Sequence, residues 1–206
     1  MMSDVHEHME HAEHVEHAAH SNKKIALVIA VLALFLAFSE TLGKSAQTNA
    51  ITANIEASDL WAFFQAKTIR QTVLRTASEF KSIELASLDG SAKSAMQKQI
   101  ENWQKTADRY ESDPQSREGR KELTERAQAT EKRRDLNFAK YENYELASAA
   151  FQIGIVLASA SVITGMIALV WGAGGLGLIG LAFTGFGLFA PEMLERLQHL
   201  VGAGGA

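Results

Sequence analysis

Cysteine is absent from the 206-residue sequence, and only two of its residues are proline. The absence of cysteine excludes disulfides, thiolate metal sites and cysteine nucleophiles. The shortage of proline leaves long segments free of the residue that most strongly breaks helices. No stretch alternates apolar and polar residues as a half-buried strand does, whereas apolar residues recur at helical spacing along much of the chain. The sequence therefore predicts an all-α protein.

Charged residues are nearly absent from two long segments. The first, residues 25–43, has Glu40 as its only charged side chain. Its 19 residues form a helix of about 28 Å, close to the roughly 30 Å hydrocarbon core of a bilayer. This length predicts a transmembrane helix. A cleaved signal peptide is the alternative, but the preceding residues are acidic apart from Lys23 and Lys24, and no small-x-small cleavage site follows.

The second such segment, residues 146–191, contains no Asp, Glu, Lys or Arg. It is too long for one crossing and is interrupted by WGAGG at residues 171–175, a cluster typical of a turn. We therefore predict two further transmembrane helices, at residues 147–171 and 173–190. Because the last of them is rich in glycine and ends at Pro191, a re-entrant hairpin is the alternative for it.

The segment between these regions, residues 44–146, is helical in pattern and highly charged. Its 17 Lys and Arg nearly balance its 16 Asp and Glu, which argues against nucleic-acid binding. Two runs of apolar or small residues at three-four spacing predict an antiparallel helical hairpin with a turn at DGSA, residues 89–92. The first run is Ala62, Ala66, Ile69, Val73, Phe80 and Ile83, and the second is Ala92, Met96, Ile100, Trp103, Ala107 and Tyr110. A third helix is predicted to start with Asp113 as its N-cap and Pro114 in its first position.

Two motifs in this arrangement resemble a known family. They are NIEASDLWAFFQAKTIRQ at residues 54–71 and FQIGIVLASASVITG at residues 151–165. The ASDLWAFFQAK block, with Trp61 and Gln65, is the more specific of the two. Over most of its length the chain resembles the bacterial family catalogued as domain of unknown function 4337. The resemblance implies a helical membrane protein and no particular activity.

The N-terminal tail, residues 1–24, is rich in histidine and glutamate. Within HEHMEHAEHVEHAAH, most histidines follow a glutamate by four residues, a pairing that firms a helix when histidine is protonated. Neighbouring histidines can share zinc, nickel or copper, but a three-residue repeat turns by about 60° per step around a helix, so few of them converge. Three interpretations stay open: a solvated or amphipathic tail, a weak metal site and a pH-responsive element. The histidines of the weak metal site are His8, His11, His14, His17 and His20. No other cofactor is expected.

Small residues recur along both hydrophobic regions and predict close helix packing. The seam of the first region continues into Glu40 and Lys44. The packing residues predicted from both seams are Ala30, Ala33, Ala37, Gly154, Ala158, Ser161 and Gly165. Their partner is either another helix of the same chain or a second copy. Glu40 also has two interpretations: a polar or ion-conducting site inside a bundle, or a carboxylate that reaches the interface and pairs with Lys44.

Two further motifs each have a structural and a functional interpretation. GLGLIG at residues 175–180 matches the dinucleotide fingerprint G-x-G-x-x-G, but without a preceding strand it indicates packing glycines. Aromatic and basic residues just after the first crossing predict an interaction collar near the membrane surface; the alternative is that the rings pack inside the hairpin. The collar residues are Trp61, Phe63, Phe64, Lys67 and Arg70.

These features predict a multi-pass protein of the bacterial inner membrane, with one N-terminal and two C-terminal crossings around an extramembrane helical hairpin and a C-terminal tail at residues 191–206. The expected function is non-enzymatic: a scaffold anchored in lipid that self-associates into a homo-oligomer and presents the hairpin to protein partners. The alternative is an oligomeric pore or ion-handling protein that uses Glu40 and the histidine tail. Five basic residues before the second crossing, against Lys23 and Lys24 before the first, favour a cytoplasmic hairpin.

Overall fold

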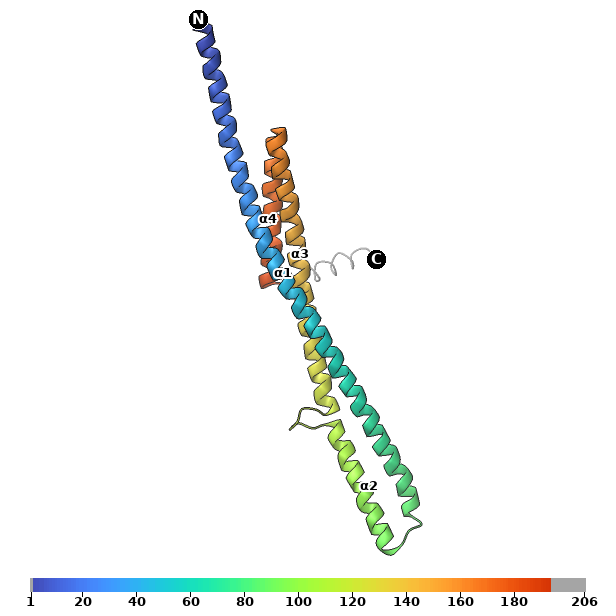
Figure 1. The fold of residues 1–206 in the computed structure, drawn as a ribbon. Helices are drawn as coiled ribbons and strands as arrows, with labels where there is room; N and C mark the ends of the chain where they lie inside the picture. Colours follow the sequence, from blue (N-terminus) through green and yellow to red (C-terminus); the bar gives the residue numbers. More distant parts are fainter. Residues whose placement is uncertain (1, 194–206) are drawn as a thin grey trace, which may run out of the picture. The chain divides into compact units, whose positions relative to one another are not determined.

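The computed structural model describes residues 2–193, with side chains described from Lys23 onward. This part of the chain consists of four α-helices and no strand (Figure 1), so the predicted all-α class is confirmed for it. The helices are α1 (Met2–Leu85), α2 (Gly90–Glu111), α3 (Arg120–Thr164) and α4 (Ile167–Phe189).

Helix α1 is unusually long, at 84 residues. Between Met2 and Leu85 the sequence has no proline and a single glycine, Gly43, so no residue of this segment breaks the helix. Within the part of the chain that the structure describes, three helical segments are long and apolar enough to cross a membrane: Lys23–Leu85, Arg120–Thr164 and Ile167–Phe189.

The helices build two compact units. The first combines Met1–Thr48 with Leu136–Ala206, and the second is Asn49–Asp135. Helices α1 and α3 contribute to both units, whereas α4 belongs to the first and α2 to the second.

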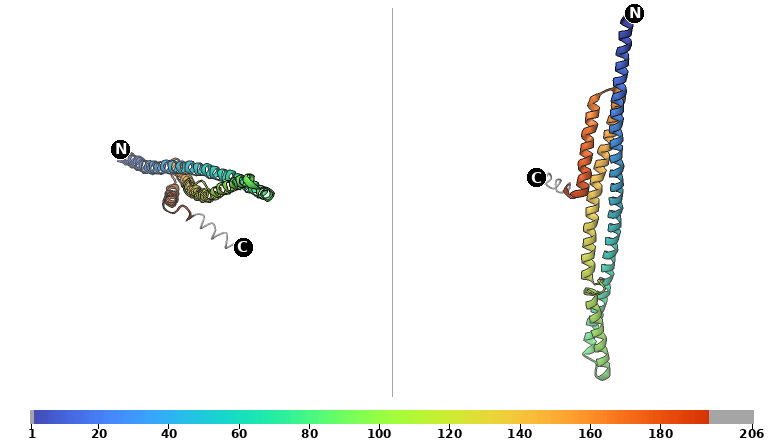
Figure 2. Two further views of the ribbon diagram at one scale, coloured as in Figure 1. Left: turned by 90° about the horizontal axis from the view of Figure 1, so that it is seen from below. Right: turned by 90° about the vertical axis from the view of Figure 1, so that its left-hand side faces the viewer.

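The core of the first unit is formed by α1, α3 and α4, which lie side by side there (Figure 2). Phe151 on α3 is fully buried and stacks on Phe35 of α1, with ring centroids 5.9 Å apart. The buried cluster comprises Ile25, Leu32, Ala147, Phe151, Ala158 and Ala173. Three of these six are alanines, and such small side chains let the helix backbones approach closely.

Glycines of α4 allow the same close approach. A Cβ atom at Gly177 would lie 2.8 Å from a Leu32 methyl group, and one at Gly180 would lie 2.7 Å from the Phe151 ring. Both glycines are buried. These two members of the G-x-G-x-x-G match therefore serve packing, whereas Gly175 has open space around it.

The turn between α3 and α4 lies at Gly165 and Met166, so its predicted position at residues 171–175 is wrong. Gly165 has a φ of 69°, a left-handed conformation that glycine adopts at little cost. The WGAGG segment lies inside α4, where Ala173 is fully buried in the core and Gly174 and Gly175 are exposed. Gly165, which the sequence assigned to a packing seam, instead ends a helix.

The second unit is built from the later part of α1, from α2 and from the beginning of α3. Leu60, Leu123 and Ala127 form its buried cluster, with Trp61, Phe63 and Phe64 packed against it. Ile100 and Ala107 on α2 are also buried, which confirms the middle of the apolar run predicted for that helix. The turn after α1 covers residues 86–89, just before the predicted position.

The prediction that the apolar run from Ala62 to Ile83 packs inside the hairpin is wrong. Ile69 and Phe80 of that seam are 65% and 67% exposed, whereas Gln71 and Ser78 are 2% and 5% exposed. Beyond Leu60, the buried face of α1 therefore carries the polar residues Gln71 and Ser78, while large apolar residues lie outside. Gln71 is buried with hydrogen-bonding partners on α2 and α3, whereas the Ser78 hydroxyl donates to the Leu74 carbonyl of its own helix at 2.8 Å.

The start of the third helix also differs from the prediction, because α3 begins at Arg120 and not at Pro114. Asp113 does not cap α3; its Oδ1 atom accepts a hydrogen bond from the Ser116 backbone N–H at 3.2 Å. Glu122 accepts hydrogen bonds from the Ser112 hydroxyl at 2.6 Å and from the Asp113 backbone N–H at 3.2 Å. These bonds hold residues 112–119 as an ordered loop in place of a first helical turn.

Candidate functional site

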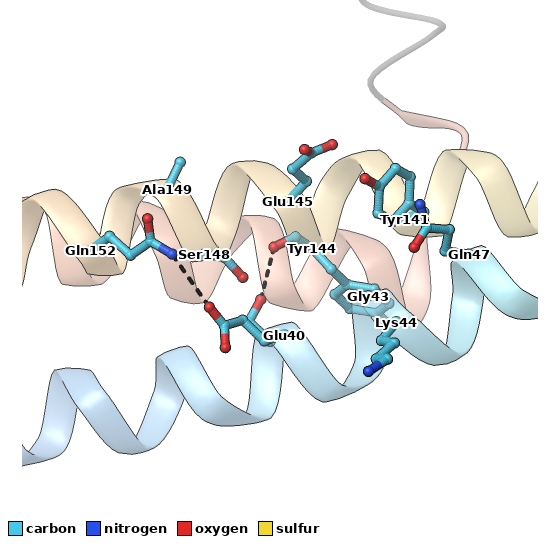
Figure 3. Close-up of a pocket in the computed structure, with 11 residues that line it drawn as sticks. Glu40, Gly43, Lys44, Gln47, Tyr141, Tyr144, Glu145, Ser148, Ala149 and Gln152 are labelled. Atoms are coloured by element: carbon cyan, nitrogen blue, oxygen red, sulfur yellow. Dashed lines mark hydrogen bonds between the residues drawn. The ribbon is translucent and has the colours of Figure 1, made fainter.

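A polar pocket of about 470 Å³ lies between α1 and α3 in the first unit (Figure 3). Its polar lining includes Glu40, Lys44, Gln47, Tyr141, Glu145 and Gln152. The Gln152 side-chain amide donates a hydrogen bond to the Glu40 carboxylate at 3.3 Å. Buried Ser39 donates to the Tyr144 carbonyl at 3.0 Å and so fixes the two helices beside each other.

Glu40 is partnered by α3 in this pocket. Figure 3 shows the Lys44 ammonium group directed away from the Glu40 carboxylate, while Gln152 points towards it. The carboxylate itself belongs to an exposed residue. The arrangement offers two acidic acceptors, Glu40 and Glu145, beside hydroxyl and amide groups, a chemistry that suits a cation or a polar headgroup. Among the residues with described side chains, no group of three or more His, Asp or Glu side chains is placed to hold a metal ion.

Of the two predicted packing seams in the first unit, the one on α3 is buried and the one on α1 is exposed. Gly154, Ala158 and Ser161 on α3 are buried, and a Cβ at Gly154 would lie 3.3 Å from the Ala173 carbonyl oxygen. This seam therefore packs against helices of the same chain. The α1 seam is on the outside of the unit, and its members Ala30, Ala33 and Ala37 are exposed.

The second unit contains a polar network around the buried side chain of Gln71 that joins its three helices. The Gln71 amide on α1 donates to the Ala107 carbonyl at 3.0 Å and to the Glu111 carboxylate at 2.9 Å, both on α2. Arg120 at the start of α3 donates to the Gln71 side-chain oxygen at 2.7 Å and to Glu111 at 2.9 Å. The hydrogen bond from Gln71 lowers the pKa of Glu111, and the Arg120 charge lowers it further against the opposing effect of burial.

The residues predicted as an interaction collar are mostly engaged inside the second unit. The Trp61 indole N–H donates to Glu131 at 2.9 Å, and the Trp61 ring meets Phe64 edge to face at 5.6 Å. Lys67 lies over the Phe63 ring at 5.1 Å and pairs with Glu118 at 3.6 Å. Arg70 is exposed. Four of the five side chains therefore stabilise the unit, as in the packing interpretation of this motif.

The residues predicted from the sequence did not include Gln71, Glu111 and Arg120. Gln71 lies eleven residues after Leu60 and seven after Phe64, so the three share one face of α1. That spacing indicates that Gln71 lies on the same face as two apolar residues. It does not indicate which residues form hydrogen bonds with the Gln71 amide. Asn143 was also missed: it is fully buried and donates to the Pro191 carbonyl at 3.0 Å, which ties α3 to the end of α4.

The histidines of the proposed metal site, His8 to His20, have side chains outside the described residues. Their placement relative to one another and to any metal stays a prediction.

The profile of the family described as domain of unknown function 4337 matches residues 21–190. The chain belongs to this family. The matched residues of the chain include the Glu40 pocket, the Gln71 network and all of α2, α3 and α4. The histidine-rich residues 6–20 precede the match. No curated protein and no solved structure matches the chain.

Proposed function

We propose that this protein is a non-enzymatic helical scaffold of the bacterial inner membrane, anchored by three crossings, that self-associates and presents its second unit to protein partners. The observation that carries the proposal is the unbroken helix α1, from Met2 to Leu85. Helix α1 thereby contains both the apolar segment at residues 25–43 and, from Asn49 onward, a segment of the highly charged second unit. An apolar anchor segment and a polar segment within one helix suit a scaffold.

The exposed apolar surface of the first unit supports the membrane anchor. Leu27 and Phe38 on α1 are 66% and 58% exposed, and Val156 on α3 is 65% exposed. Large apolar side chains that are this exposed in a single chain indicate contact with lipid or with another protein. The long helices satisfy their own backbone hydrogen bonds, as a crossing segment must.

The interior of the second unit supports a structural role for it. Its polar groups bind one another: buried Gln71 and the half-buried Glu111 and Arg120 link three helices. Trp61 and Lys67 are likewise paired inside the unit. Such internal pairing rigidifies a helical module, which then presents its outer surface to partners.

Self-association is tested by the mass of the full chain in detergent and in lipid nanodiscs, measured by light scattering with the detergent and lipid contribution subtracted. The proposal predicts at least twice the 22.5 kDa of one chain. A protein mass of 22.5 kDa over the whole accessible concentration range contradicts it.

A second candidate function, ion handling, is favoured by the pocket beside Glu40. Under this candidate, liposomes containing the protein show cation flux, and Glu40→Gln abolishes the flux while the oligomeric mass is unchanged. Gln47→Ala is the matched control, since it changes a polar lining residue without removing a charge. Absence of flux from the unmodified protein rules this candidate out.

A further inference from the structure

The second unit leaves one apolar stripe on its outside. It consists of Ile51, Ile55, Ile69, Val73, Phe80 and Ile83, which are 49% to 73% exposed. All six belong to α1, and no residue of the unit on α2 or α3 is among its exposed large hydrophobic residues. We call these six residues the α1 stripe.

The α1 stripe lies opposite the packed face of its helix. Gln71 and Ser78 face inward and are buried, whereas Val73 and Phe80, each two residues further along, are 60% and 67% exposed. Residues between the stripe members on the same face, such as Ser58, Ala62 and Thr76, are small or uncharged. The stripe is therefore an uncharged band along one side of a helix in an otherwise highly charged segment.

The length and area of the α1 stripe suit another long helix. From Ile51 to Ile83 it extends for about 48 Å at 1.5 Å per residue. Taking on the order of 150–200 Å² for a large side chain, the six residues expose roughly 600 Å². With the smaller residues between them this approaches the ~800 Å² that each partner contributes to a standard interface, and it is at the upper limit of the patches that ordinary monomers expose.

A second copy of the chain supplies a matching surface. A helix–helix contact with two-fold symmetry uses the same patch on both molecules, and only α1 offers such a patch in this unit. Ile69, Val73, Phe80 and Ile83 follow one another at intervals of four, seven and three residues, which fit the contact positions of a coiled coil. The nearest acidic residue beyond the stripe, Glu84, is paired with Lys81 of its own chain at 2.6 Å.

We propose that two copies of this protein pair in parallel through the α1 stripe. The inference rests on the proposed membrane anchor, because two copies inserted in one bilayer present α1 in the same direction. Each stripe residue then meets its own counterpart in the partner. Confinement to a membrane raises the effective concentration of the two stripes.

The absence of native cysteine allows a direct test by disulfide formation in the full chain, in native membranes. Ile69→Cys and Phe80→Cys are oxidised separately, with Ser82→Cys as the matched control, because Ser82 is exposed but lies off the stripe. Parallel pairing brings identical positions within the few ångströms that a disulfide requires. Both stripe variants are expected to give at least about tenfold more cross-linked dimer than the control.

A charged substitution separates pairing from chance collision. Val73→Glu places a carboxylate in the centre of the stripe at an exposed position, so it leaves the fold of one chain intact, which circular dichroism checks. In the Phe80→Cys background it is expected to reduce cross-linking to the level of Ser82→Cys. Unchanged cross-linking overturns the proposal.

The other outcomes distinguish this inference from the proposed function. An oligomeric mass with no stripe disulfide overturns the α1 pairing and leaves the scaffold standing. A disulfide that forms only between co-expressed Ile69→Cys and Phe80→Cys chains shows antiparallel contact and overturns parallel pairing. Protection of the stripe thiols by lipid in a protein of monomeric mass overturns both.

Discussion

At the scale of single residues, the buried amide of Gln71 holds the second unit together. Its side chain donates to α2 and accepts from Arg120 of α3. Gln71→Ala removes both interactions and leaves Glu111 and Arg120 with fewer partners. A buried polar group that loses its partner costs about 1–3 kcal/mol, so we expect the free energy of unfolding to fall by about 2 kcal/mol.

Chemical denaturation followed by circular dichroism measures that loss. Thr72→Ala is the control, because Thr72 is an exposed neighbour that bonds only to the Thr68 carbonyl of its own helix. Surface substitutions of this kind change stability by about 0.5 kcal/mol or less. Equal losses in the two variants contradict a central role for the network.

Glu111 makes the stability of the second unit depend on pH. The hydrogen bond from Gln71 and the charge of Arg120 lower its pKa below the ordinary value of 4.5. A carboxyl group whose pKa is lowered by folding contributes stability that is present above that ordinary value and is lost as the pH falls through the lowered one.

We therefore expect unfolding midpoints to decrease as the pH falls below 4.5, and Glu111→Gln to weaken this dependence. Glu101→Gln, at an exposed position on the same helix, serves as the control and is expected to keep it. Parallel pH profiles of the unmodified protein and Glu111→Gln contradict the assignment.

Only some residues of the candidate sites could be predicted from the sequence. Periodicity identified one apolar run on α1 but not the face that α2 and α3 cover, because the burial of Gln71 depends on hydrogen-bond partners distant in sequence. Ile69 and Gln71 show the result: the isoleucine is exposed and the glutamine is buried. Glu40 was identifiable as an isolated charge in an apolar segment, but its Gln152 partner lies 112 positions away.

At the scale of elements, the close packing of α4 depends on particular glycines. A Cβ at Gly180 would lie 2.7 Å from the Phe151 ring, whereas a Cβ at Gly185 has no neighbour within 4 Å. Phe151 is fully buried and has little room to move. Overfilling a packed core costs about 1–3 kcal/mol, so Gly180→Ala is expected to lower the thermal unfolding midpoint.

Gly185→Ala, on the same helix, is the matched control for this prediction. Without a steric conflict, alanine stabilises a helix by roughly 0.5–1 kcal/mol relative to glycine, so the midpoint should rise slightly or stay unchanged. Both midpoints are measured in the same detergent. A Gly180→Ala protein as stable as the control variant contradicts the packing described for α4.

Element types were more predictable than element boundaries. The scarcity of proline and the helical periodicity predicted helices throughout, and α2 begins at Gly90, close to the predicted turn. The turn at Gly165 was missed because one left-handed glycine decides it, whereas the conspicuous WGAGG cluster lies inside α4. A glycine needed for its φ and a glycine needed for its size look alike in one sequence.

At the scale of the whole molecule, membership of the domain of unknown function 4337 family and three helical segments of sufficient length and apolarity support the account of an anchored helical protein. Hydropathy predicts such segments well because a bilayer imposes both length and composition. Self-association is not visible in a single chain, and for this reason it rests on the exposed surfaces of α1.

The most direct test of the central claim, a membrane-anchored protein with its helical unit outside the bilayer, uses a single cysteine at the exposed Ser91 position of α2. Spheroplasts producing Ser91→Cys are treated with a membrane-impermeant maleimide, intact and after lysis, and the membrane fraction is washed with carbonate. The account predicts a protein that stays in the membrane fraction and is labelled only after lysis, which places the second unit in the cytoplasm. Release of the protein by carbonate contradicts the anchor, and labelling of intact spheroplasts contradicts the orientation.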